Sequence, residues 1–95
     1  MGGMQDLLEQ IVVMNGIQIG RVVDVILGAK DEVIGFEVRC EDRQHRFLPS
    51  AAATRRERTI AIDSPFALLD ADQLEFYRRR GRTLRTREGA GSLSR

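Results

Sequence analysis

Soft metal ligands and thiols are scarce in this chain of 95 residues. It contains one cysteine, Cys40, and one histidine, His45. One cysteine excludes an intrachain disulfide framework, and the pair is too few for an intrachain zinc site. A Ser/His/Asp catalytic set is not credible either, because His45 stands alone between Gln44 and Arg46 on a short predicted strand. The sequence therefore predicts no metal site, no cofactor and no catalytic residue.

Aromatic residues and long apolar runs are also scarce. Four Phe, one Tyr and no Trp exclude a large aromatic core or an aromatic-rich stacking surface. The longest uninterrupted apolar run has four residues, as at 11–14, whereas a membrane helix needs about 20. Residues 1–10 show no basic segment followed by an apolar one, so no signal peptide is predicted. We expect a cytoplasmic protein without a transmembrane segment.

Charged residues are plentiful and unevenly distributed. The formal net charge is +1, but residues 78–95 contain seven Arg and one Glu, a balance of +6 that leaves −5 for residues 1–77. Fourteen of the fifteen basic residues are Arg, a bias that a GC-rich coding sequence would also produce. The chain thus combines an acidic body with a basic C-terminal segment.

Alternating apolar residues predict five short strands joined by tight turns, at residues 7–14, 17–27, 33–40, 44–48 and 59–63. Asn15-Gly16 tolerates the positive φ angles of a type I′ turn and predicts a hairpin between the first two. Apolar residues on both faces of the second strand indicate either a bulge near Gly20 or a second buried face. This pattern predicts an all-β fold, either a small antiparallel barrel or a sandwich. The core residues expected are Ile19, Val25, Ile34, Phe36, Val38, Leu48, Ile60 and Ile62.

The periodicity changes after residue 69. Asp70 is suited to the N-cap of a helix, and Gln73 completes a capping box. Gly81 is suited to the position that follows the last helical residue. We predict a helix over residues 70–81, docked on the barrel or on a second subunit because so short a helix is marginal alone.

The second strand carries a motif that points to a family. Ile19-Gly20-Arg21-Val22-Val23-Asp24-Val25 resembles the I-G-x-V-x-D-V signature of the PRC-barrel family, and Asn15-Gly16 and Phe47-Leu48-Pro49 match its turn and its L-P strand end. The resemblance implies a small β-barrel without intrinsic catalysis. Similar modules form the cytoplasmic part of the photosynthetic reaction-centre H subunit and the C-terminal half of the ribosome maturation factor. This chain most resembles the stand-alone members.

The chain is therefore predicted to divide into four parts. Residues 1–6 form a disordered N-terminus, residues 7–69 the PRC-type barrel, residues 70–81 the C-terminal helix and residues 82–95 a basic, disordered tail.

The leading functional hypothesis is a non-enzymatic binding module that forms a homodimer and docks protein partners. Val22 and Ile26 lie on the face of the second strand opposite its main apolar row, and Phe76 and Tyr77 are surplus apolar groups on the helix. We expect these four to contact a partner. Asp24, the acidic residue of the motif, is read as a hydrogen-bonded carboxylate because no second polar group converges with it.

The alternative hypothesis is an RNA- or ribosome-associated accessory protein that binds through its basic segment. Six arginines in ten residues could neutralise phosphates, and they could equally meet an anionic membrane surface or the acidic body of a neighbouring subunit. The aromatic residues of a stacking site are absent among them. The arginines are Arg78, Arg79, Arg80, Arg82, Arg85 and Arg87.

Overall fold

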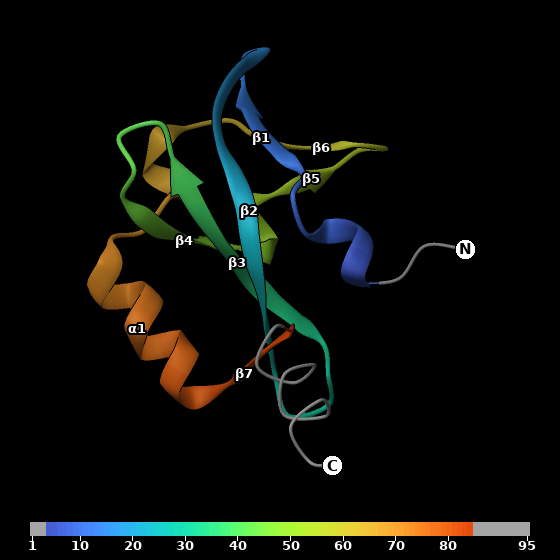
Figure 1. Cartoon of the computed structure of the whole chain (residues 1–95), viewed down its shortest axis with the longest axis vertical. Helices are drawn as coiled ribbons and strands as arrows, with labels where there is room; N and C mark the ends of the chain where they lie inside the picture. The colour runs from blue at the N-terminus through green and yellow to red at the C-terminus, as the bar shows by residue number, and fades with distance from the viewer. Residues whose placement is uncertain (1–3, 85–95) are drawn as a thin grey trace.

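In residues 4–84, one strongly curled sheet and one α-helix make up most of the fold (Figure 1). The structure, a computed structural model, describes residues 4–84. The strands are β1 (Ile11–Met14), β2 (Ile17–Leu27), β3 (Val33–Cys40), β4 (His45–Pro49), β5 (Thr54–Arg55), β6 (Thr59–Ile62) and β7 (Arg82–Thr83). The helix is α1 (Ala71–Arg80), and three short 3₁₀ helices are η1 (Met4–Leu7), η2 (Ser50–Ala52) and η3 (Pro65–Ala67).

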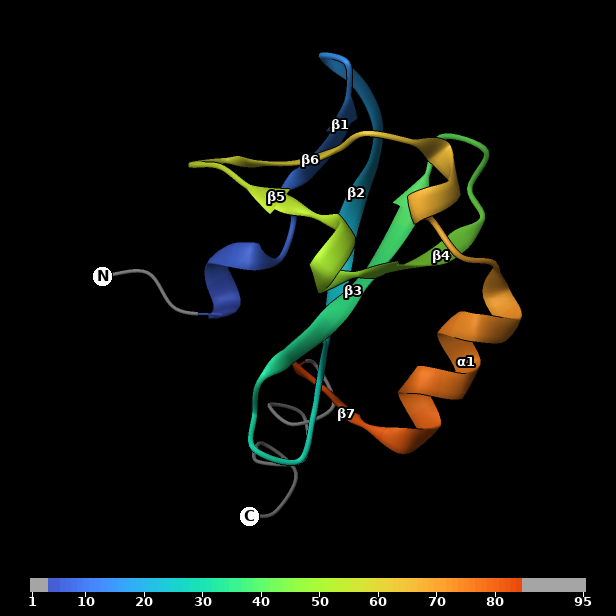
Figure 2. The ribbon, with the colours of Figure 1, turned by 180° about the vertical axis from the view of Figure 1, so that it is seen from behind.

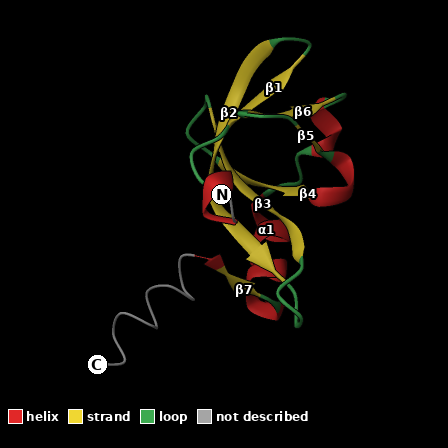
Figure 3. Cartoon of the chain, turned by 90° about the vertical axis from the view of Figure 1, so that its right-hand side faces the viewer, coloured by secondary structure: helices red, strands yellow, loops and turns green. Residues whose placement is uncertain are grey.

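The sheet is mixed, which corrects the prediction of a wholly antiparallel barrel. Its strands run in the order β4-β3-β2-β1-β6-β5, with β7 added to β2, and they wrap around the core (Figures 2 and 3). β1 and β6 pair in parallel, from Ile11 opposite Thr59 to Met14 opposite Ile62, and the other pairings are antiparallel. Alternation along a strand indicates which side chains face the core, but it does not indicate the direction of a partner distant in sequence.

Bulges explain why β2 is apolar on both faces. Val12 is opposite Gly20 and Val13 is opposite Gln18, so Ile19 is an extra residue and the predicted bulge near Gly20 is confirmed. A second register shift leaves Val23 unmatched between Val22 and Asp24. Because each extra residue exchanges the two faces of the strand, both series of apolar residues in β2 become buried.

The main core confirms most of the predicted buried residues. Val25, Phe36, Val38, Leu48, Ile60 and Ile62 are all buried in it, together with Val12, Val22 and Leu27. Ile19 is only partly buried at the edge of this core. Ile34 packs elsewhere, beneath the helix, because a register shift in the β2–β3 pairing places it on the other face.

A second apolar cluster attaches α1 to the outer face of the sheet. It consists of Ile26, Phe47 and Leu74, with Ile34, Leu69 and Tyr77 packed against them. The rings of Phe47 and Tyr77 stack with their centroids 4.4 Å apart. Asp70 is the N-cap, and its side chain accepts a hydrogen bond from the N–H of Gln73, as predicted. The helix therefore docks on the sheet of its own chain.

Gly81 ends the helix for a reason other than a left-handed conformation. Its φ is −108°, an extended value open to any residue. A Cβ at this position would instead lie 2.5 Å from the carbonyl oxygen of Leu27. Gly81 is thus required by the close approach of two backbone segments, where the chain turns from α1 into β7.

Gly81→Ala is expected to lower the free energy of unfolding by about 1–3 kcal/mol, because backbone must move to admit the methyl group. The matched control is Gly28→Ala, for which the three atoms nearest to the added Cβ all belong to the flexible side chain of Glu32. That substitution is expected to cost no more than about 1 kcal/mol. Urea unfolding of both variants measures the difference, and equal costs would contradict the assignment.

Both ends of the described chain are more ordered than predicted. Residues 4–6 belong to η1, and Leu7 at its end is buried in the main core. β7 pairs with β2, Thr83 is buried and Leu84 joins the main core, so residues 82–84 are not a disordered tail. The remaining predicted disordered residues, 1–3 and 85–95, lie outside the described part of the chain.

Candidate binding surface

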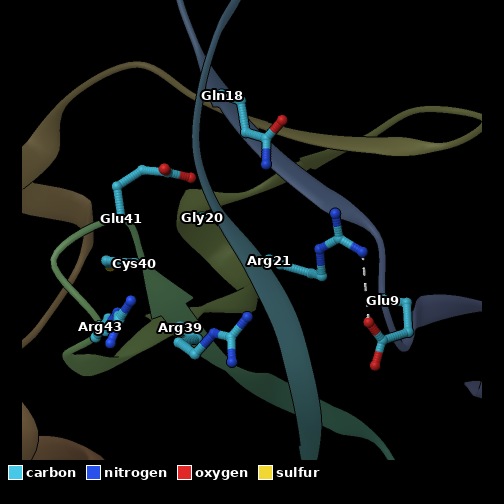
Figure 4. A pocket seen from close by; sticks show the side chains of 8 residues that line it. All are labelled: Glu9, Gln18, Gly20, Arg21, Arg39, Cys40, Glu41 and Arg43. Atoms are coloured by element: carbon cyan, nitrogen blue, oxygen red, sulfur yellow. Dashed lines mark ion pairs between the residues drawn. The ribbon is translucent and has the colours of Figure 1, made fainter.

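Two grooves adjoin each other beside the β1–β2 hairpin and the β3–β4 turn. The first, of about 740 Å³, contains three arginines, and we call it the basic groove (Figure 4). The second, of about 450 Å³, is walled by Met14, Ile19, Pro65 and Leu68, and we call it the apolar groove. Gln18, Cys40 and Glu41 line both. The two grooves therefore adjoin each other at these three residues.

The basic groove brings like charges together. Arg21 of β2 and Arg39 of β3 are directly opposite each other in the antiparallel pairing, and Arg43 comes from the β3–β4 turn. Nη1 of Arg21 lies 3.6 Å from Oε1 of Glu9. Within residues 4–84, the guanidinium groups of Arg39 and Arg43 have no ion-pair partner.

The turn between β3 and β4 is held by an ion pair at the rim of the apolar groove. Arg46 donates from Nη1 and Nη2 to the two carboxylate oxygens of Asp42, at 3.1 and 2.9 Å. Oδ1 of Asp42 also accepts a hydrogen bond from the N–H of Gln44. The hydrogen bonds from Arg46 and then from Gln44 hold the pKa of Asp42 below its ordinary value of 3.8.

Arg46→Gln is expected to raise the pKa of Asp42 towards 3.8. Since this pKa is lowered in the folded chain, the ion pair contributes stability above pH 3.8 and loses it as the pH falls through the folded pKa. An NMR titration of the Asp42 carboxyl carbon measures the shift. Arg43→Gln is the control, and it should leave the Asp42 titration unchanged. An equal shift in both variants would show that general charge, rather than the ion pair, lowers the pKa.

The most exposed large apolar side chain in the described part of the chain is next in sequence to a residue of the apolar groove. Phe66, which follows Pro65 of the groove wall, is 88% exposed. It sits in η3, where the hydroxyl of Ser64 caps the turn by accepting a hydrogen bond from the N–H of Phe66. Ile17, opposite Met14 in the hairpin, is 66% exposed. Sequence patterning missed this surface.

Val22 and Ile26 are not surface residues, so the prediction that they contact a partner is wrong. Both are fully buried within the single chain, Val22 in the main core and Ile26 beneath α1. Tyr77 is half-buried against Phe47. Phe76 is 47% exposed, and the guanidinium of Arg80 lies 4.8 Å from its ring centroid. Of the four, only Phe76 remains an accessible apolar group.

Several arginines of the basic segment have partners within the fold. Arg78 lies 3.5 Å from the buried carboxylate of Glu37, and Arg82 pairs with Asp31. Arg80 contacts Phe76, as described above, and Arg79 is exposed. The ion pairs of Arg78 and Arg82 connect α1 and β7 to the β2–β3 hairpin. The predicted contact residues Arg85 and Arg87 lie outside the described residues.

Sequence reasoning missed the cluster formed by Glu37, His45 and Arg78. Nδ1 of His45 is 2.5 Å from Oε2 of Glu37, whose side chain is 8% exposed. The three residues come from β3, β4 and α1, so only the strand register and the helix position bring them together. Asp24 is also buried, and its Oδ1 accepts a hydrogen bond from the N–H of Val25, an arrangement typical of a structural carboxylate.

The chain matches no family model, no curated protein and no solved structure. The resemblance to the PRC-barrel family therefore rests on the sequence motifs alone. Among residues 4–84, no group of three or more His, Cys, Asp and Glu side chains is placed to hold a metal ion. The helices in the same residues are too short to cross a membrane.

Proposed function

We propose that the chain is a non-enzymatic binding module of the PRC-barrel type, which docks protein partners and associates with itself. The observation that carries the proposal is the exposure of Phe66 beside the apolar groove. Aromatic residues are enriched where proteins meet, and burying a Phe side chain contributes roughly 1.5–3 kcal/mol. The turn of η3, which Ser64 caps, holds the Phe66 ring exposed to solvent in the absence of a partner.

The same surface replaces β2 as the proposed dimer contact. Val22 and Ile26 are fully buried within the single chain, so they no longer support a contact with a second copy. Ile17, Phe66 and the apolar groove form a surface that a two-fold contact would bury. Phe76, on the helix, is a secondary candidate.

The test is photo-crosslinking in native cytosol from a benzophenone amino acid placed at position 66 of the full chain. We expect specific protein adducts that include the chain's own dimer. The control places the same group at position 57, an exposed residue between β5 and β6. Adducts of equal yield from both positions, or none from position 66, would refute the docking surface. Adducts to RNA instead of protein would favour the alternative function.

Light scattering at micromolar concentration tests self-association separately. A mass near 10.7 kDa across the range would exclude a stable dimer. If a dimer forms, Phe66→Ser should weaken it more than Phe76→Ser does. The reverse order would place the contact on α1.

A further inference from the structure

We propose that the partner segment is acidic, with carboxylates bound in the basic groove and a neighbouring apolar side chain bound in the apolar groove. This inference rests on the proposed function and names the chemistry of its partner. The occupant is a segment of another protein in which Asp or Glu stands close to an apolar residue.

The first argument is the pairing of Arg21 with Arg39. Like charges directly opposite each other on adjacent strands destabilise a sheet. Glu9 offsets this only weakly, because the Arg21 and Glu9 side chains are 43% and 59% exposed and water screens the pair. A carboxylate placed between the two guanidinium groups would remove the repulsion and accept charge-assisted hydrogen bonds from both.

The second argument is the availability of the guanidinium groups. Figure 4 shows the side chain of Arg39 lying between those of Arg21 and Arg43 on the groove wall. Arg39 and Arg43 are exposed, and in the described part of the chain neither is engaged by an acidic side chain. The planar guanidinium matches a carboxylate with two parallel hydrogen bonds. The groove therefore offers donors that the fold itself does not use.

The third argument is the adjacency of the two grooves, which share Gln18, Cys40 and Glu41 as lining residues. An extended segment advances about 3.3 Å per residue, so neighbouring side chains can reach both grooves. Glu41, at the shared boundary, would repel a carboxylate and so favours an apolar side chain there. The acidic residues are then placed at the end where Arg21 and Arg39 lie.

Charge also favours an acidic segment over a nucleic acid. The folded part of the chain, residues 4–84, carries 12 basic and 13 acidic side chains, so its net charge of −1 gives no general attraction for a long polyanion. The basic groove is a local exception of limited extent. A few carboxylates on a short segment can bind within this groove, whereas a long polyanion would extend beyond it.

The test selects peptides from a random library on the folded full chain and measures the affinity of the selected peptides. We expect Asp or Glu beside an apolar residue among them. Arg39→Gln combined with Arg43→Gln should weaken their binding by about tenfold or more. Arg56→Gln combined with Arg58→Gln is the matched control, since these arginines are exposed near β5 and β6. The control should change affinity by less than about twofold.

The inference fails if no peptides are selected, if the selected peptides show no acidic enrichment, or if the two double variants lose affinity equally. Displacement of the peptides by a single-stranded oligonucleotide of higher affinity would also overturn it, in favour of a nucleic acid.

Crosslinking from position 66 separates the acidic-segment inference from the proposed docking function. If protein adducts persist unchanged in the Arg39 and Arg43 double variant, the acidic-segment inference fails and the docking function stands. If the parent chain gives no adduct, the docking function itself fails.

Discussion

Phe36→Ala is expected to lower the free energy of unfolding by about 3–5 kcal/mol. Phe36 is 1% exposed in the main core, and it is opposite Val25 on one neighbouring strand and Leu48 on the other. Removing the ring leaves a cavity beside β2, β3 and β4. These strands are hydrogen-bonded to each other and cannot all move to fill it. Small domains have roughly 5–15 kcal/mol of stability in total, so this single change removes a large part of it.

Urea denaturation followed by circular dichroism measures this loss. Phe66→Ala removes the same side chain from a site that is 88% exposed, and it should alter stability by no more than about 0.5 kcal/mol. Comparable losses in the two variants would mean that the assignment of the core is mistaken. The comparison is made at a concentration where association does not contribute.

Phe47→Ala is expected to cost about 3–5 kcal/mol as well, but through the second cluster. Phe47 is 1% exposed between the sheet and α1, with Tyr77 stacked on its ring. Gly35 makes room for this ring, since a Cβ at Gly35 would lie 2.5 Å from Cζ of Phe47. Without the ring, α1 loses the largest of its contacts with the sheet and, at ten residues, is marginal alone.

Hydrogen exchange distinguishes this loss from a general one. In Phe47→Ala, the amides of α1 should lose protection before those of β2 and β3. Tyr77→Phe keeps the stacked ring and should leave α1 protected. Uniform loss of protection across the chain would indicate that the second cluster and the main core unfold as one unit.

The features that are local in sequence could be predicted without the structure. The bounds of β2 and β3 agree with the predicted residues 17–27 and 33–40. Asn15 and Gly16 have φ values of 54° and 78°, the positive angles expected of their turn. The cap at Asp70 was predicted too. Each of these features depends on interactions within a few residues, which the order of side chains along the chain already specifies.

The features that depend on distant partners could not be predicted. The parallel pairing of β1 with β6 joins segments that are far apart in the chain. The burial of Val22 and Ile26 follows from a bulge in the β2–β3 pairing and from the docking of α1, neither of which alternation alone encodes. The opposition of Arg21 and Arg39, the contact of Arg78 with Glu37, and the apolar groove beside Phe66 likewise exist only once strands and turns are assembled. The candidate binding surface is therefore a product of tertiary structure, because register and close packing, rather than local propensity, bring its side chains together.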